Sequence, residues 1–159
     1  MKPEEIVGQI LKEQKRTLAL AESCTGGLIS SRITDVSGSS GYFMGGVVAY
    51  SNEAKESILS VPHDILVANG AVSSETALAM AKGVKKLLDT SLGLAVTGIA
   101  GPEGGTKEKP VGLVYIALFS DVASITEKFL FSGNRSEIKE QTYLEALKMV
   151  IGTLSRPGP

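Results

Sequence analysis

Near its amino terminus the chain places three potential nucleophiles directly before two glycines, in the order Ser23, Cys24, Thr25, Gly26 and Gly27. They follow an apolar, strand-like run, "LALAE", and precede a helix-like pattern. Ligands of open α/β sheets bind beyond the carboxyl ends of strands, where helix amides attract anions and glycines let a ligand approach the backbone. The same residues also fit an ordinary strand-to-helix turn in which Thr25 caps the helix. Because no Walker or dinucleotide glycine spacing is present, the pattern leaves both interpretations open.

A nucleophilic serine needs a base, and the segment "AYSNEAK" supplies a candidate in Lys55. Tyr50 ends a strand, and Lys55 follows it by about one helical turn. Lysine is ordinarily a solvated surface residue, but in a cleft against apolar walls its pKa falls far enough for it to act as a base. The single histidine, His63, stands in what reads as a helix-opening turn, where a capping or surface role is expected. A Ser-His-Asp triad is therefore disfavoured.

Two further stretches suit the binding of an anion. The loop "TGIAGPEGGTKEKPVG" is rich in glycine, so its backbone amides can surround a phosphate or an oxyanion, and Lys107 and Lys109 add positive charge. The alternative is a long flexible connection. Arg135 stands at the start of the last helix, where a cation is unfavourable unless an anion binds beside it, as in a bidentate phosphate clamp. Chance placement of Arg135 explains the sequence equally well.

Periodic apolar residues predict the elements that must position these groups. Helices are expected at 3–15, from 28 for about ten residues, at 52–59, 73–90 and 136–155, and strands at 17–23, 42–51, 92–101, 113–120 and 124–133. Helices interleaved with apolar strands predict a three-layer α/β/α sandwich around a mixed, mostly parallel sheet with an antiparallel hairpin. Gly45 and Gly46 interrupt their strand and indicate a bulge or a close backbone approach. We expect a single domain over residues 1–159, with a frayed tail at 153–159.

Composition excludes several classes of function. The formal net charge is −1 and aromatic residues make up 5% of the chain, so the sequence carries no electrostatic footprint for nucleic acid or an anionic membrane. One cysteine excludes an internal disulfide framework, and with one histidine it makes a Cys/His zinc site unexpected. The first sixteen residues, "MKPEEIVGQILKEQKR", carry charge throughout and resemble neither a signal peptide nor a membrane anchor. We expect a cytoplasmic protein.

Several motifs together resemble the family of CinA carboxy-terminal domains, whose free-standing form is nicotinamide mononucleotide (NMN) deamidase. "AESCTGG", "AYSNEAK", "GAVS", "TGIAGPEGGTKEKPVG" and "FSGNR" occur in the family's order and spacing, over about residues 4–151. The resemblance implies an amidohydrolase that converts NMN and water into nicotinic acid mononucleotide and ammonia, in a homodimer. The inventory of possible ligands suggests no metal, and no cofactor is expected. It implies Ser23 as nucleophile, assisted by Tyr50 and Lys55. The residues implied in substrate binding are Cys24, Thr25, Gly26, Gly27, Gly101, Gly104, Gly105 and Arg135.

Residues and resemblance support one mechanistic hypothesis. Lys55, neutral or hydrogen-bonded through Tyr50, draws the proton from Ser23, and backbone amides between Cys24 and Gly27 stabilise the oxyanion. Cys24 is the rival nucleophile because a thiol is intrinsically more reactive, although no histidine neighbour is evident and adjacent strand residues point in opposite directions. The alternative function is a nucleotide-binding regulatory module without turnover, associated with competence or DNA damage.

Overall fold

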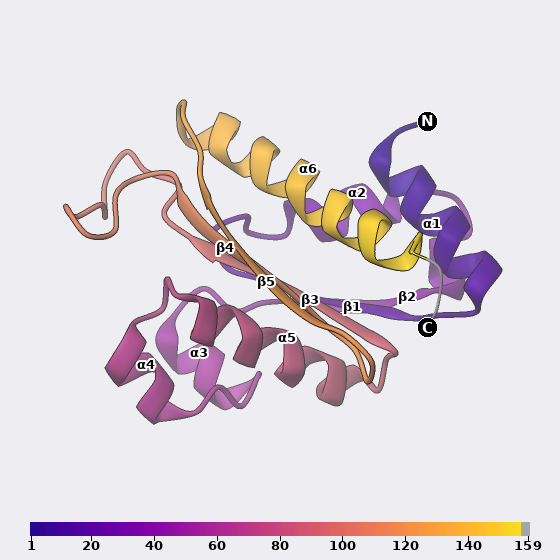
Figure 1. Cartoon of the computed structure of the whole chain (residues 1–159), viewed down its shortest axis with the longest axis horizontal. Helices are drawn as coiled ribbons and strands as arrows, with labels where there is room; N and C mark the ends of the chain where they lie inside the picture. The colour runs from indigo at the N-terminus through magenta and orange to yellow at the C-terminus, as the bar shows by residue number, and fades with distance from the viewer. Residues whose placement is uncertain (157–159) are drawn as a thin grey trace.

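The computed structural model describes residues 1–156 and is built around a five-stranded sheet (Figure 1). The strand order is β2-β1-β3-β4-β5, with bounds Leu18–Glu22 for β1, Phe43–Val48 for β2, Leu92–Gly98 for β3, Leu113–Phe119 for β4 and Ser124–Leu130 for β5. Strand β1 pairs in parallel with both β2 and β3, whereas β4 runs antiparallel to β3 and β5. Only β4 therefore opposes the other strands, which confirms a mixed, mostly parallel sheet with an antiparallel hairpin.

Helices cover both faces of the sheet, as the three-layer prediction requires (Figure 1). On one face lie α1 (Pro3–Gln14), α2 (Leu28–Thr34) and α6 (Arg135–Leu154), and on the other lie α3 (Asn52–Ser57), α4 (His63–Asn69) and α5 (Ser74–Leu88). Three helices begin with a side-chain cap. The side chains of Ser51, Ser73 and Asn134 accept hydrogen bonds from the first-turn amides of α3, α5 and α6.

The two faces of the sheet have different packing because large and small residues alternate along its central strands. Leu18 and Leu20 of β1 belong to the core under α1, α2 and α6, whereas Ala19 and Ala21 belong to the core under α5. Strand β3 adds Gly93 to the second core, where an added Cβ would lie 2.1 Å from a backbone oxygen of α5. Small side chains thus let α5 approach the sheet closely, directly beneath the strands whose ends carry the candidate site.

The glycine pair in β2 has the predicted effect on the strand. The pairing of β1 with β2 shifts between Leu18 and Ala19, so that Met44 has no partner across the ladder and Gly45 takes the next position. At Gly46 the expected close approach also occurs, because α2 lies so near the strand that an added Cβ would be 2.3 Å from Ser30 Oγ. The bulge and the missing side chain together let α2 rest against the edge strand.

The end of α6 corrects the predicted tail. Thr153 and Leu154 still belong to the helix, and Leu154 is buried among the residues packed under α1 and α6. An apolar side chain in the last turn of an amphipathic helix keeps that turn folded, so the tail begins later than 153. Residues 157–159 of the predicted tail lie outside the described part of the chain.

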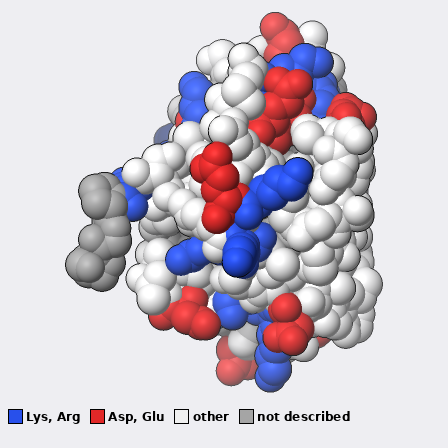
Figure 2. Space-filling view, turned by 90° about the vertical axis from the view of Figure 1, so that its right-hand side faces the viewer, with Lys and Arg blue, Asp and Glu red and all other residues white. Residues whose placement is uncertain are grey.

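The surface carries charges of both signs. Figure 2 shows a face on which Lys and Arg lie interspersed with Asp and Glu, with wide uncharged areas between them. This distribution agrees with the net charge of −1. Among residues 1–156, no helix combines the length and the apolar character needed to cross a lipid bilayer.

Candidate active site

The turn after β1 is held by a buried carboxylate. Glu22, the last residue of β1, is fully buried and accepts four hydrogen bonds from the start of α2. The donors are the Ile29 amide at 2.9 Å, the Ser30 amide at 2.9 Å, and the hydroxyls of Ser30 and Thr25 at 2.6 Å. The prediction that Thr25 caps this helix is therefore wrong, because its hydroxyl donates to Glu22 and Gly27 takes the N-cap position. The carboxylate performs the capping and fixes the turn that carries Ser23.

Lys55 lies at the centre of the site, and its ammonium is almost completely withdrawn from solvent. The residue is 1% exposed, and its Nζ lies 3.1 Å from Ser23 Oγ, 3.0 Å from the Ala49 carbonyl and 3.1 Å from the Tyr50 carbonyl. Helix α3 supplies this side chain, and its cap Ser51 fixes the first turn immediately after Tyr50. Within residues 1–156 Lys55 has no carboxylate partner, and burial at this depth without one is unusual for a structural lysine.

The surroundings of Lys55 favour its neutral form. Burial lowers the pKa of Lys55 from its ordinary 10.5, because a charged amine loses its hydration. When the amine is neutral, its two N–H groups can donate to the carbonyls of Ala49 and Tyr50, and its lone pair then faces Ser23 Oγ. The arrangement is that of a base hydrogen-bonded to a nucleophile.

Cys24 is unsuited to the role of nucleophile. Its side chain is buried, and burial raises the pKa of the thiol to about 12. The reactive form of cysteine is the thiolate, which is scarce at neutral pH when the pKa is this high. Cys24 also packs with the core under α1, α2 and α6. Of the two adjacent candidates, only Ser23 has a base within hydrogen-bond distance.

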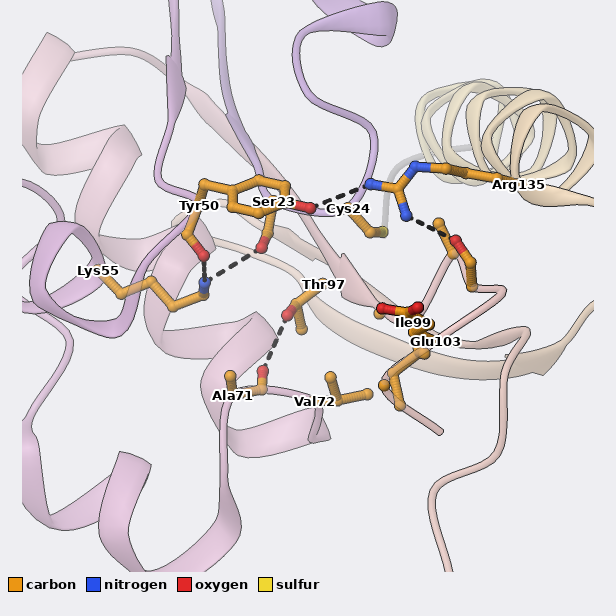
Figure 3. A pocket seen from close by; sticks show the side chains of 14 residues that line it. Ser23, Cys24, Tyr50, Lys55, Ala71, Val72, Thr97, Ile99, Glu103 and Arg135 are labelled. Carbon is orange, nitrogen blue, oxygen red and sulfur yellow. Dashed lines mark hydrogen bonds between the residues drawn. The ribbon is translucent and has the colours of Figure 1, made fainter. Parts of the chain in front are cut away.

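Tyr50 and Arg135 meet across the mouth of the site (Figure 3). Tyr50 is 61% exposed, and its hydroxyl accepts a hydrogen bond of 3.0 Å from Arg135 Nη2. Arg135 Nη1 donates to the Gly101 carbonyl at 2.7 Å. The predicted link between Lys55 and Tyr50 therefore runs through the Tyr50 backbone carbonyl, and the Tyr50 phenol instead positions Arg135.

These side chains surround one pocket of about 240 Å³ at the carboxyl ends of β1 and β3 (Figure 3). This volume is below the roughly 300–1,000 Å³ of typical ligand pockets, so it suits one ring and its substituent, with the rest of a larger ligand extending toward the mouth. Thr97 donates from its hydroxyl to the Ala71 carbonyl at 2.8 Å and thereby joins β3 to the segment before α5. The lining residues are Ser23, Cys24, Tyr50, Lys55, Ala71, Val72, Thr97, Gly98, Ile99, Ala100, Gly101, Glu103, Gly104 and Arg135.

Comparison with known proteins identifies the chain. The CinA C-terminal domain family matches residues 1–154. The chain belongs to this family. A CinA-like protein of Geotalea uraniireducens is 52% identical over 142 residues, which are 89% of this chain and 34% of that protein. A CinA-like protein of Geobacter sulfurreducens is 52% identical over 141 residues, with the same coverage of 89% and 34%. The chain thus spans about a third of the length of these curated relatives.

Solved structures of the CinA family share the fold. The competence/damage inducible protein CihA from Agrobacterium tumefaciens superposes with a TM-score of 0.91 at 39% identity, covering 97% of this chain and 96% of that chain. A competence or damage-inducible protein from Enterobacter asburiae superposes with a TM-score of 0.93 at 30% identity, covering 96% of each chain. These matches confirm the α/β fold and the resemblance found in the sequence.

In this CinA domain, the predicted site residues divide into two groups. The pocket brings together Ser23, Cys24, Tyr50, Lys55, Gly101, Gly104 and Arg135. Thr25, Gly26, Gly27 and Gly105 are not among its lining residues. Thr25 is buried against Glu22, and Gly26 and Gly27 form the turn with positive φ angles of 61° and 103°. Gly105 packs against Val111, where an added Cβ would lie 2.8 Å from a backbone amide.

Residues outside the predicted site complete or surround it. Glu22 stands at the end of an apolar run, where a charged side chain is buried with the strand. Because a buried carboxylate needs hydrogen-bond donors, this position could have predicted that Glu22 caps the following helix. Thr97 and Glu103 lie in stretches that the sequence marked only for their glycines. Lys109 donates to the Asn69 carbonyl at 2.6 Å, so it ties the loop to α4. His63 has the expected surface role, since its ring is exposed and contacts Glu56 at 2.6 Å.

Proposed function

We propose that the chain is an amidohydrolase that deamidates nicotinamide mononucleotide to nicotinic acid mononucleotide and ammonia. The observation that carries this proposal is the contact of 3.1 Å between Lys55 Nζ and Ser23 Oγ inside a pocket closed to bulk water on the lysine side. Binding alone does not require a buried amine beside a serine hydroxyl, because burying that amine costs free energy of folding. Acyl transfer through a serine hydroxyl requires an adjacent base, and a neutral lysine amine can serve as that base.

The first half of the reaction acylates Ser23. Lys55 Nζ takes the hydroxyl proton while Ser23 Oγ bonds to the carboxamide carbon, and the carbonyl oxygen becomes an oxyanion. The Lys55 ammonium then gives the proton to the departing nitrogen. The bond from carbon to nitrogen breaks, and ammonia leaves an ester on Ser23. The amide would lie beside Lys55, with its ring between Val72 and Ile99 and its phosphate toward Arg135 at the mouth.

The second half returns the enzyme to its starting state. A water molecule gives its proton to Lys55 and attacks the ester carbon, and Ser23 Oγ leaves with the proton from Lys55. For the oxyanion, the amide of Gly26 already donates to the Ser23 carbonyl at 3.1 Å. Of the predicted donors, only Cys24 lines the pocket, and its amide remains as the donor for the oxyanion because it has no backbone acceptor in the described chain.

Ammonia release from NMN tests the proposal, with the two adjacent residues as a matched pair. We expect Ser23→Ala to abolish release and Cys24→Ala to retain most of it. Hydroxylamine should intercept the ester as a hydroxamate in wild-type protein and in Cys24→Ala. Activity in Ser23→Ala together with loss in Cys24→Ala would assign the chemistry to the thiol instead.

A regulatory module that binds the nucleotide without turnover is the second candidate. The names of solved relatives favour it, since they describe proteins induced by competence or damage and state no chemistry. Calorimetry with NMN alongside an ammonia assay separates the two functions. Tight binding with no release above background would establish the module. The expected homodimer and cytoplasmic location stay predictions.

A further inference from the structure

Two charged side chains of opposite sign line the pocket without an ion pair. Arg135 uses its guanidinium on two neutral oxygens, the carbonyl of Gly101 and the hydroxyl of Tyr50. Within residues 1–156, the carboxylate of Glu103 makes neither a hydrogen bond nor a salt bridge, although it lines the same pocket. Both charges are therefore uncompensated, and both face the space in which a ligand would lie.

The loop holds Glu103 in this place through contacts of its backbone. Gly101, two residues before Glu103, is buried and has a positive φ of 76°. An added Cβ there would lie 2.4 Å from a methyl group of Val111, so the loop folds back on itself at this point. Gly104 follows with a φ of 91°, and the Thr106 amide donates to the Lys109 carbonyl at 2.8 Å. Figure 3 shows the result, in which Glu103 and Ile99 lie at the opposite end of the pocket from Lys55.

We infer that Glu103 makes the pocket selective for amides carried on a cationic ring. The inference rests on the proposed function, which places the amide at Ser23. In NMN the ring nitrogen is quaternary and carries a positive charge, whereas the phosphate is negative. The positive ring of such a ligand can face Glu103, and its negative phosphate can face Arg135. Glu103 is thus a specificity residue, and it takes no part in the movement of protons.

The expected effect is modest because Glu103 is exposed. Exposed ion pairs change an equilibrium constant by about two- to fivefold, and salt screens them. We therefore expect Glu103→Gln to weaken the binding of NMN by about two- to fivefold at low ionic strength, and by less as salt is added. A ligand with a neutral ring should bind equally well to both proteins.

The test compares two ligands that differ in the charge of the ring. NMN and its dihydro form share the carboxamide, the ribose and the phosphate, but the ring of the dihydro form is neutral. Dissociation constants are measured by calorimetry in a Ser23→Ala background, which prevents turnover. Glu108→Gln is the matched control, because Glu108 is an exposed glutamate of the same loop outside the pocket. We expect Glu103→Gln to weaken NMN alone and Glu108→Gln to change neither ligand.

Three results would overturn the inference. Unchanged dissociation constants for both ligands in Glu103→Gln would show that Glu103 does not sense the ring charge. Equal weakening of both ligands would show that it only shapes the loop. If either of these results were found while wild-type protein still released ammonia from NMN, the proposed function would stand and only the inference about Glu103 would fall. If NMN neither bound nor reacted with wild-type protein, the proposed function would fall first and the inference with it.

Discussion

Replacing Glu22 with glutamine tests whether a single carboxylate holds the turn that carries Ser23. The carboxylate accepts from Thr25, Ser30 and the Ile29 amide, and every partner is a donor. Glutamine keeps one acceptor oxygen, but its amide nitrogen would face donors on the other side. Two of the four hydrogen bonds to the carboxylate are therefore lost. The hydroxyl on that side can rotate and accept from the glutamine amide, but the backbone amide is left without an acceptor.

The size of the effect follows from these contacts. Hydrogen bonds to a charged group contribute about 1.5–3 kcal/mol each, so losing two costs about 3–6 kcal/mol. Removing a buried charge returns part of this free energy, since Glu22 is fully buried. We expect a net loss of about 3 kcal/mol, a large share of the roughly 5–15 kcal/mol that stabilises a typical domain. For a chain of this size it corresponds to a fall in Tm of about 6–12 °C.

Urea unfolding and thermal melting measure the loss, and Glu53→Gln provides the control. Glu53 is an exposed glutamate in the first turn of α3, so its substitution should change the free energy of unfolding by less than about 0.5 kcal/mol. Glu22→Gln should also lower kcat for ammonia release, because the turn that presents Ser23 loosens. A loss in Glu22→Gln below about 1 kcal/mol would refute the account of the buried cap.

Three further predictions concern the base and the packing around it. Because only neutral Lys55 can take the proton, kcat/KM should rise with pH and level off above the pKa of Lys55, which burial lowers from 10.5. Lys55→Arg should lower kcat by about 10²–10⁴-fold and remove this rise with pH. The hydroxyl of Tyr42 is buried against Gly8 without a hydrogen-bond partner in the described chain, so Tyr42→Phe should raise the free energy of unfolding by about 1–2 kcal/mol in urea titration. An added Cβ on Gly83 would lie 1.9 Å from the Leu59 carbonyl, so Gly83→Ala should lower stability by about 1–3 kcal/mol, and an unchanged melting curve would contradict the close packing of α5.

Much of the fold was predictable because the signals act over short distances along the chain. Caps such as Asn134 and Ser73 can be recognised in a sequence because a cap bonds to an amide only three residues later. The hairpin of β4 and β5 follows from two apolar runs separated by a short turn. Periodicity also placed the end of α6 correctly to within one residue, at 155, whereas the tail predicted from 153 began too early because Leu154 packs against other helices.

For the candidate site, the sequence by itself determined which chemical groups are available, and the tertiary structure decided which of them meet. The types and order of Ser23, Lys55 and Arg135 were visible in the sequence, since they stand in glycine-rich turns and at helix starts. Thirty-two residues separate Ser23 from Lys55 and eighty-five separate Tyr50 from Arg135, so no local pattern fixes their contacts. The folded chain buries the amine of Lys55 beside one hydroxyl and two carbonyls, and that burial lowers its pKa. A lysine can act as a base near neutral pH when loss of hydration lowers its pKa, and only the folded chain excludes water from the amine.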